Sequence, residues 1–189
     1  MSTIDFMLSV RQQRMLRAVL LQPDRQYRSS ELIAISGPGY GAGKRLLDEF
    51  EQSGIVRTTR KGNQLLFCAN VHHPIYPELL AICRKTFGID DTVASEFISF
   101  DGRIELAFIF GSVAAGRERP HSDLDVMIVG RLDMVELEPA IERLSKAIGR
   151  KVDLNLHTPE QWYLLQSDKV MRSIVNGKTI LLAGRIGQA

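Results

Sequence analysis

The stretch FGSVAAGRERPHSDLD, residues Phe110–Asp125, decides the fold of the second half of this 189-residue chain. The apolar run Ile104–Phe110 leads into it, as expected for a strand that is covered on both faces. A strand that ends in Gly111-Ser112 and enters a helix presents free backbone N–H groups and a hydroxyl, which together suit an anion. Gly111 also lets a phosphate approach the backbone, because it has no Cβ.

Two carboxylates close the same stretch. Asp123 and Asp125 stand two residues apart at the start of a second predicted strand, Leu124–Val129, so both side chains are expected on one face. Carboxylates that lie this close repel each other unless a cation sits between them, and Mg²⁺ prefers such oxygen ligands. Asp153, on a third predicted strand at Lys151–His157, can supply a third carboxylate. Three acids beside a phosphate cradle suit a two-metal phosphoryl or nucleotidyl transfer.

Each feature alone has a plainer interpretation. An Asp-x-Asp pair is usually surface charge or a turn, and a Gly-Ser pair after a strand is usually a loop. The two features occur here together, at a fixed spacing and between apolar strands. The combination therefore favours a catalytic type of site over either plain interpretation.

The order of these motifs resembles the polymerase β-like nucleotidyltransferases, especially their minimal, MNT-type prokaryotic members. The resemblance covers about residues 74–183: a strand, Gly111-Ser112, a helix, Asp123-Leu124-Asp125 on a strand, another helix, and Asp153 on a strand. It implies an α+β domain with a mixed sheet flanked by helices.

The resemblance also implies an activity and roles for individual residues. The expected reaction is the Mg²⁺-dependent transfer of a nucleoside monophosphate from a nucleoside triphosphate, usually ATP, to an acceptor hydroxyl. By resemblance Asp123 and Asp125 would hold both metal ions, and Asp153 would hold the catalytic one and help to deprotonate the acceptor. The nucleotide would be bound by three residues: Gly111, Ser112 and Ser122.

One position departs from the family pattern. Many members carry a basic residue where this chain has Ala115. Arg117 or Arg119 can take over that charge. The departure bears on the affinity for triphosphate and on turnover, and leaves the expected fold unchanged.

The first 70 residues predict a second, smaller domain. Helical patterns over residues 9–21, 31–36 and up to about Gly54 are followed by two strand-like runs around Lys61-Gly62-Asn63, which is a β-hairpin signal. Three helices and a hairpin resemble the winged helix-turn-helix domains of small prokaryotic transcription regulators. We therefore divide the chain into a winged helix at 1–71, a helical bridge at 72–100 and the nucleotidyltransferase domain at 101–189.

The candidate DNA contacts are the basic residues of the third helix and the hairpin, where such folds meet the major groove and the backbone. They are Lys44, Arg45, Arg57, Arg60 and Lys61. A winged helix used for dimerisation or for another protein contact is the alternative, because Gly39, Gly41 and Gly43 make an unusual surface for reading bases.

Composition restricts the classes of protein to which this chain can belong. The net charge is +2, with a small positive excess in the first 70 residues. No apolar run is long enough to span a bilayer, and Asp5 with no preceding basic stretch does not suit a signal peptide. Two cysteines are too few for a disulfide framework, so a reduced, cytoplasmic protein is expected.

Two functions remain open at this point. The first is a nucleotidyltransferase with a DNA-binding type of regulatory domain, acting on an acceptor that the residues do not name. By resemblance, a small helical toxin is the preferred protein acceptor. The second is a DNA-binding regulator whose nucleotidyltransferase domain senses nucleotide or is inactive. A homodimer is compatible with both.

Overall fold

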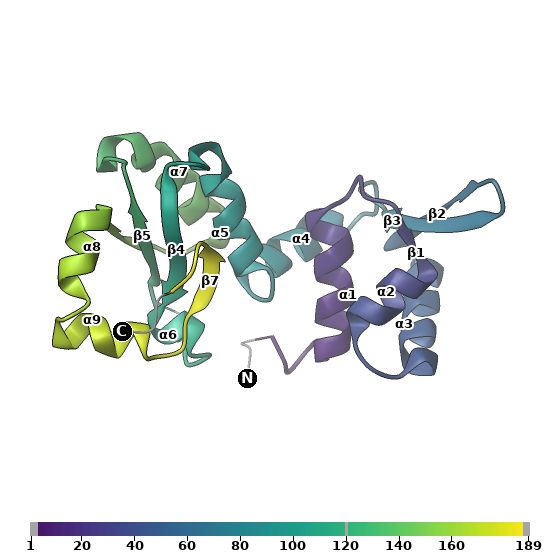
Figure 1. Ribbon diagram of the computed structural model, residues 1–189. Helices are drawn as coiled ribbons and strands as arrows, with labels where there is room; N and C mark the ends of the chain where they lie inside the picture. The colour runs from purple at the N-terminus through teal and green to yellow at the C-terminus, as the bar shows by residue number, and fades with distance from the viewer. Residues whose placement is uncertain (1–3, 120, 187–189) are drawn as a thin grey trace. The chain divides into compact units, whose positions relative to one another are not determined.

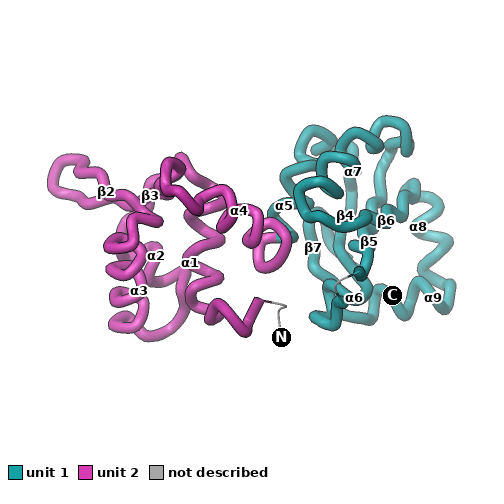
Figure 2. Tube along the Cα trace, turned by 180° about the vertical axis from the view of Figure 1, so that it is seen from behind, with its two compact units in different colours: residues 1, 89–189 teal, residues 2–88 magenta. Residues whose placement is uncertain are grey.

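The computed structural model describes residues 4–119 and 121–186. Its contacts divide the chain into two compact units on either side of the bond between Gly88 and Ile89 (Figure 2). We describe each unit by itself.

The N-terminal unit begins with three helices and a short sheet (Figure 1). The helices are α1 (Val10–Leu21), α2 (Ser29–Ser36) and α3 (Tyr40–Gln52). Ser9 caps α1 in a capping box with Gln12, in which each side chain accepts a hydrogen bond from the other residue's backbone N–H. In α2 the Glu31 carboxylate accepts a hydrogen bond from the backbone N–H of Arg28 at 2.7 Å, so this helix begins two residues earlier than its sequence pattern predicts.

The predicted hairpin is present. Strands β2 (Val56–Lys61) and β3 (Gln64–Ala69) pair in antiparallel register around Gly62, whose φ of +61° suits a glycine in a tight turn. The short strand β1 (Tyr27–Arg28) pairs with the other edge of β3, which gives the order β1-β3-β2.

The helix α4 (Tyr76–Lys85) also packs on this unit. Its Cys83 is fully buried in the core that α1 to α3 share, beside residues such as Met15, Val19 and Leu47. The next helix, α5 (Ile89–Phe97), packs on the core of the C-terminal unit. The segment expected to form one helical bridge, residues 72–100, is therefore shared between the two units.

A mixed four-stranded sheet organises the C-terminal unit. Its order is β6-β5-β4-β7, with β5 parallel to β6 and the other neighbours antiparallel. The strands are β4 (Ile104–Phe110), β5 (Leu124–Gly130), β6 (Val152–His157) and β7 (Ile180–Ala183). The chain order explains the mixed sheet, because the helix α7 (Met134–Ile148) lies between β5 and β6 and allows the parallel crossover.

Helices cover both faces of this sheet (Figure 1). On one face α5 and α7 pack against Ile109 and its neighbours, and on the other α8 (Pro159–Leu165) and α9 (Lys169–Val175) pack against Phe108. Phe108 and Ile109 are consecutive, and both are fully buried, so β4 is covered on both faces as its apolar run predicts. The 3₁₀ turn η1 (Ile98–Phe100) and the short helix α6 (Gly111–Ala114) complete the unit.

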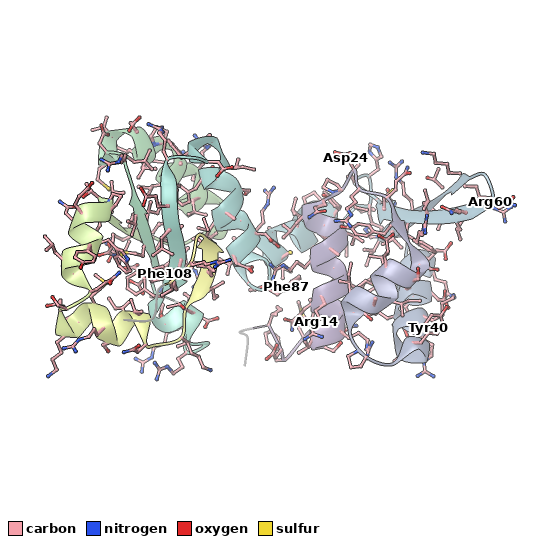
Figure 3. The ribbon with its side chains drawn as sticks, viewed as in Figure 1. Arg14, Asp24, Tyr40, Arg60, Phe87 and Phe108 are labelled. Atoms are coloured by element: carbon pink, nitrogen blue, oxygen red, sulfur yellow. The ribbon has the colours of Figure 1, made fainter. Side chains whose placement is uncertain are left out.

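Phe108 lies between the sheet and the helices α8 and α9 (Figure 3). The ring of Trp162 meets it edge to face, with 6.0 Å between the ring centroids. None of the helices in residues 4–119 and 121–186 is long and apolar enough to cross a membrane.

Candidate functional site

Gly111 and Asp125 are pressed together at one edge of the C-terminal sheet. Gly111 follows β4 directly, and the last residue of that strand, Phe110, pairs with Asp125 on β5. A Cβ on Gly111 would lie 2.0 Å from Asp125 Oδ2, and the backbone of Gly111 has a φ of +71°. The positive φ therefore favours glycine here, and any larger residue would have to displace the Asp125 carboxylate.

The three aspartates lie on adjacent strands. Asp125 and Asp153 are direct partners in the parallel register of β5 and β6, and Asp123 immediately precedes β5. Side chains alternate along a strand, so all three project from the sheet face that carries Phe108. Trp162 of α8 packs against the same face. Asp123 and Asp153 are exposed, whereas Asp125 is half-buried.

The neighbouring carboxylates bear on the protonation of Asp125. Burial, and then the charges of Asp153 and Asp123, raise the pKa of Asp125 above its usual range. A carboxylate that is desolvated next to two like charges is destabilised unless it gains a proton or a cation. The fold thus holds Asp125 where a bound cation would relieve it.

The carboxylates of the three aspartates do not converge on a single metal position. In the described part of the chain, no group of three or more His, Cys, Asp or Glu side chains is placed to hold one metal ion. The donors nevertheless fit a hard divalent cation chemically, because they are carboxylate oxygens and the charges of Asp153 and Asp123 act on Asp125. Asp123, Asp125 and Asp153 are the residues that would hold such an ion.

Ser112 and Ser122 lie at the two ends of the connection from β4 to β5. Ser112 is the second residue of α6, and its carbonyl accepts a hydrogen bond from the backbone N–H of Arg117 at 2.9 Å. The Ser122 hydroxyl accepts from the backbone N–H of Arg119, also at 2.9 Å. Ser122 therefore shapes the turn that leads to Asp123, and its contact with a nucleotide stays a prediction.

Lys151 is the site residue that the sequence reasoning did not single out. Its ammonium Nζ lies 3.8 Å from Asp123 Oδ2, and its carbonyl accepts a hydrogen bond from Leu124 N at 2.9 Å. The available signal was its spacing, because Lys151 stands two residues before Asp153 and so shares its face of the strand.

The candidate DNA contacts of the N-terminal unit are all exposed. Lys44 and Arg45 lie on α3, and Lys44 pairs with Asp48, whose hydrogen bond raises the pKa of Lys44. The other three lie on β2, with Arg60 near the far end of the hairpin (Figure 3): Arg57, Arg60 and Lys61. Arg57 Nε donates to Cys68 Sγ at 3.3 Å.

Solved structures that resemble this chain include several toxin–antitoxin complexes. A complex with AMP-PNP has a TM-score of 0.38 and 19% identity, covering 51% of this chain and 73% of that chain. MntA–HepT has a TM-score of 0.34 and 18% identity, with 51% and 70% covered. The tri-AMPylated Shewanella oneidensis HEPN toxin with MNT antitoxin has a TM-score of 0.32 and 17% identity, again with 51% and 70% covered. These likenesses are too distant to support an argument about function.

The family comparison is more specific. Among curated proteins no match was found. Residues 94–181, by contrast, match the family described as polymerase beta, nucleotidyltransferase. That range runs from α5 to the start of β7 and contains Gly111, Ser112 and all three aspartates. The C-terminal unit thus matches the polymerase β nucleotidyltransferase family over the part of the chain that carries the candidate site.

Proposed function

We propose that residues 89–189 form an Mg²⁺-dependent nucleotidyltransferase. It moves a nucleoside monophosphate from a nucleoside triphosphate, by preference ATP, to an acceptor hydroxyl. The observation that carries the proposal is the contact between Gly111 and Asp125, with Asp153 in register on the next strand. Gly111 has no side chain, so the Asp125 carboxylate can lie against the end of β4, where it and the neighbouring acids can supply cation ligands. The family match over residues 94–181 supports the same reaction.

Each residue of the site has a proposed role. The backbone N–H groups of Gly111 and Ser112, with the Ser112 hydroxyl, bind triphosphate oxygens. Asp123 and Asp125 hold two Mg²⁺ ions, and Asp153 holds one of them and accepts the proton of the acceptor hydroxyl. Bound Mg²⁺ supplies positive charge to the attacking and leaving oxygens. The acceptor oxygen forms a bond to the α-phosphorus as the bond to pyrophosphate breaks.

A protein hydroxyl is the acceptor that we favour. The family resemblance points to a small helical, toxin-like partner, and an RNA end or a small molecule remains the alternative.

Intact mass spectrometry tests the transfer. The full chain is incubated with Mg²⁺ and each nucleoside triphosphate in turn, together with any protein that co-purifies with it. We expect an adduct of one nucleoside monophosphate, and none with Asp123→Ala/Asp125→Ala. If no nucleoside triphosphate binds even at millimolar concentration, the proposed nucleotidyltransferase activity is ruled out.

A second function is proposed for the N-terminal unit: a winged helix that binds DNA. Two exposed basic residues on α3 and three on the hairpin favour it, since exposed Lys and Arg can contact phosphates. In that case the nucleotidyltransferase unit acts as a nucleotide sensor or is inactive. The same surface would otherwise serve a protein contact, including a second copy of this chain.

A salt-dependent gel shift on DNA upstream of the protein's own gene tests this second function. We expect a shift that weakens as salt rises and is lost in Arg57→Ala/Lys61→Ala. A shift that is unaffected by this double variant would exclude the hairpin as the DNA contact. No shift at low salt, together with dimers in solution, would favour the protein contact.

A further inference from the structure

Lys151 belongs to a square of four charged residues at the edge of the C-terminal sheet. The register of β5 and β6 pairs Asp125 with Asp153, and the bond from Leu124 N to the Lys151 carbonyl extends that register by one residue. Asp123 and Lys151 therefore form the outer pair of the square, and Asp125 and Asp153 form the inner pair. Lys151 is the basic member of the square.

The ion pair between Lys151 and Asp123 is open to solvent. The Lys151 side chain is 72% exposed and the Asp123 side chain is 47% exposed. Lys151 Nζ lies 3.8 Å from Asp123 Oδ2. Exposed pairs of this kind stabilise a fold only weakly. The fold therefore gains little from Lys151 in this place.

A cation held by Asp123 changes the surroundings of Lys151. The ammonium would then face a divalent ion carried by its own ion-pair partner, and like charges repel. A nearby anion would keep Lys151 at this edge. In the proposed reaction that anion is a phosphoryl group of the nucleotide.

The strand order indicates which phosphoryl group it is. Gly111 and Ser112 follow β4, whereas Lys151 precedes β6, with β5 between them. Neighbouring strands lie roughly 4.8 Å apart, so the cradle and Lys151 are on opposite sides of Asp123 and Asp125. Lys151 thus lies on the side of Asp153, away from the oxygens that Gly111 and Ser112 bind.

We infer that Lys151 binds the α-phosphoryl group, the one that is transferred. It thereby supplies positive charge to a site that has Ala115 where many members of the family that it resembles have a basic residue. This inference rests on the proposed function. Two chain segments then bind different parts of the nucleoside triphosphate. The loop after β4 binds the pyrophosphate, and the residue before β6 binds the phosphoryl group that is transferred.

Binding of the two halves of the nucleotide tests the inference. AMP and pyrophosphate are titrated separately into the full chain with Mg²⁺ and followed by calorimetry. Lys151→Met should weaken AMP binding about tenfold, the size expected for one charge-assisted hydrogen bond, and leave pyrophosphate binding within about twofold. Ser112→Ala should show the reverse. Lys151→Arg should restore AMP binding.

A metal titration gives an independent readout. Without nucleotide, Lys151→Met should bind Mn²⁺ a few-fold more tightly than the wild type, because a positive charge beside Asp123 has been removed. Lys146→Met is the matched control, since Lys146 is an exposed lysine near the end of α7 and outside the square, and it should change neither titration.

The outcomes separate this inference from the proposed function. A Lys151→Met variant with unchanged AMP affinity, or with AMP and pyrophosphate affinity lowered equally, overturns the inference while the proposed function stands. A wild-type chain that binds neither AMP nor triphosphate overturns both.

Discussion

The two units present their charged residues in opposite ways. In the C-terminal unit Asp125 is half-buried against Gly111, and two neighbouring carboxylates raise its pKa. In the N-terminal unit the candidate basic residues are all exposed, and Lys44 is already paired with Asp48. Holding like charges together opposes folding, whereas exposing basic side chains does not. The cluster of Asp123, Asp125 and Asp153 (the carboxylate edge) therefore indicates a ligand much more strongly than do the exposed basic residues of α3 and the hairpin (the basic surface).

The largest effect should come from removing one inner carboxylate. Asp153→Asn is expected to reduce nucleotidyl transfer on the order of 10³-fold, because it takes away both a metal ligand and the proposed proton acceptor. Single-turnover rates measured by intact mass check this. The control, Asp101→Asn, changes an exposed carboxylate in the turn before β4 and should react normally. Equal rates for both variants would mean that the carboxylate edge is no active site.

The contact between Gly111 and Asp125 should appear as a difference in stability. Gly111→Ala forces a Cβ to within 2.0 Å of Asp125 Oδ2, whereas Gly102→Ala also places alanine at positive φ but meets no atom within 4 Å. Gly111→Ala should therefore lose roughly 1–3 kcal/mol more unfolding free energy than Gly102→Ala. Urea titration followed by Trp162 fluorescence measures this, since the single tryptophan is buried in the C-terminal unit. Equal losses would show that the contact is not tight.

Neutralising Asp125 should stabilise the metal-free protein. Its pKa is raised in the folded state, so its charged form destabilises the fold at neutral pH. Asp125→Asn should raise the melting temperature by a few degrees at pH 7. This gain should vanish as the pH falls and the wild-type carboxyl takes up its proton. Mg²⁺ should raise the melting temperature of the wild type alone. A lower melting temperature for Asp125→Asn at pH 7 would contradict the destabilised carboxylate.

The smallest effect concerns the basic surface. Asp48→Asn removes the partner of Lys44 on an exposed helix face, so the stability of the fold should hardly change. If α3 contacts DNA, the freed Lys44 should strengthen binding and make it more sensitive to salt. A gel shift at two salt concentrations tests this, with Glu49→Gln on the same helix as the control. Identical changes for the two variants would point to net charge rather than to Lys44.

The C-terminal elements could be predicted closely because their patterns are strong. The apolar run at Ile104–Phe110 matches β4 residue for residue. The strands predicted at Leu124–Val129 and Lys151–His157 match β5 and β6 to within one residue. The mixed sheet flanked by helices followed from the family resemblance, and it is confirmed.

What could not be predicted depends on contacts between segments far apart in the chain. Residues 72–100 have two helical patterns and no signal of which core each one meets, so the separate packing of α4 and α5 was not foreseen. The ion pair between Lys151 and Asp123 depends on the parallel register of β5 and β6, which one sequence does not specify. The contact of Asp125 with Gly111 likewise depends on the pairing of β4 with β5.

The most direct test of the central claim is a calorimetric titration of the full chain with a non-hydrolysable ATP analogue, with and without Mg²⁺. We predict binding that requires Mg²⁺ and is lost in Asp123→Ala/Asp125→Ala. Binding that is equally tight without Mg²⁺, or that survives in the double variant, would contradict the claim that these aspartates hold a metal-bound nucleotide against Gly111.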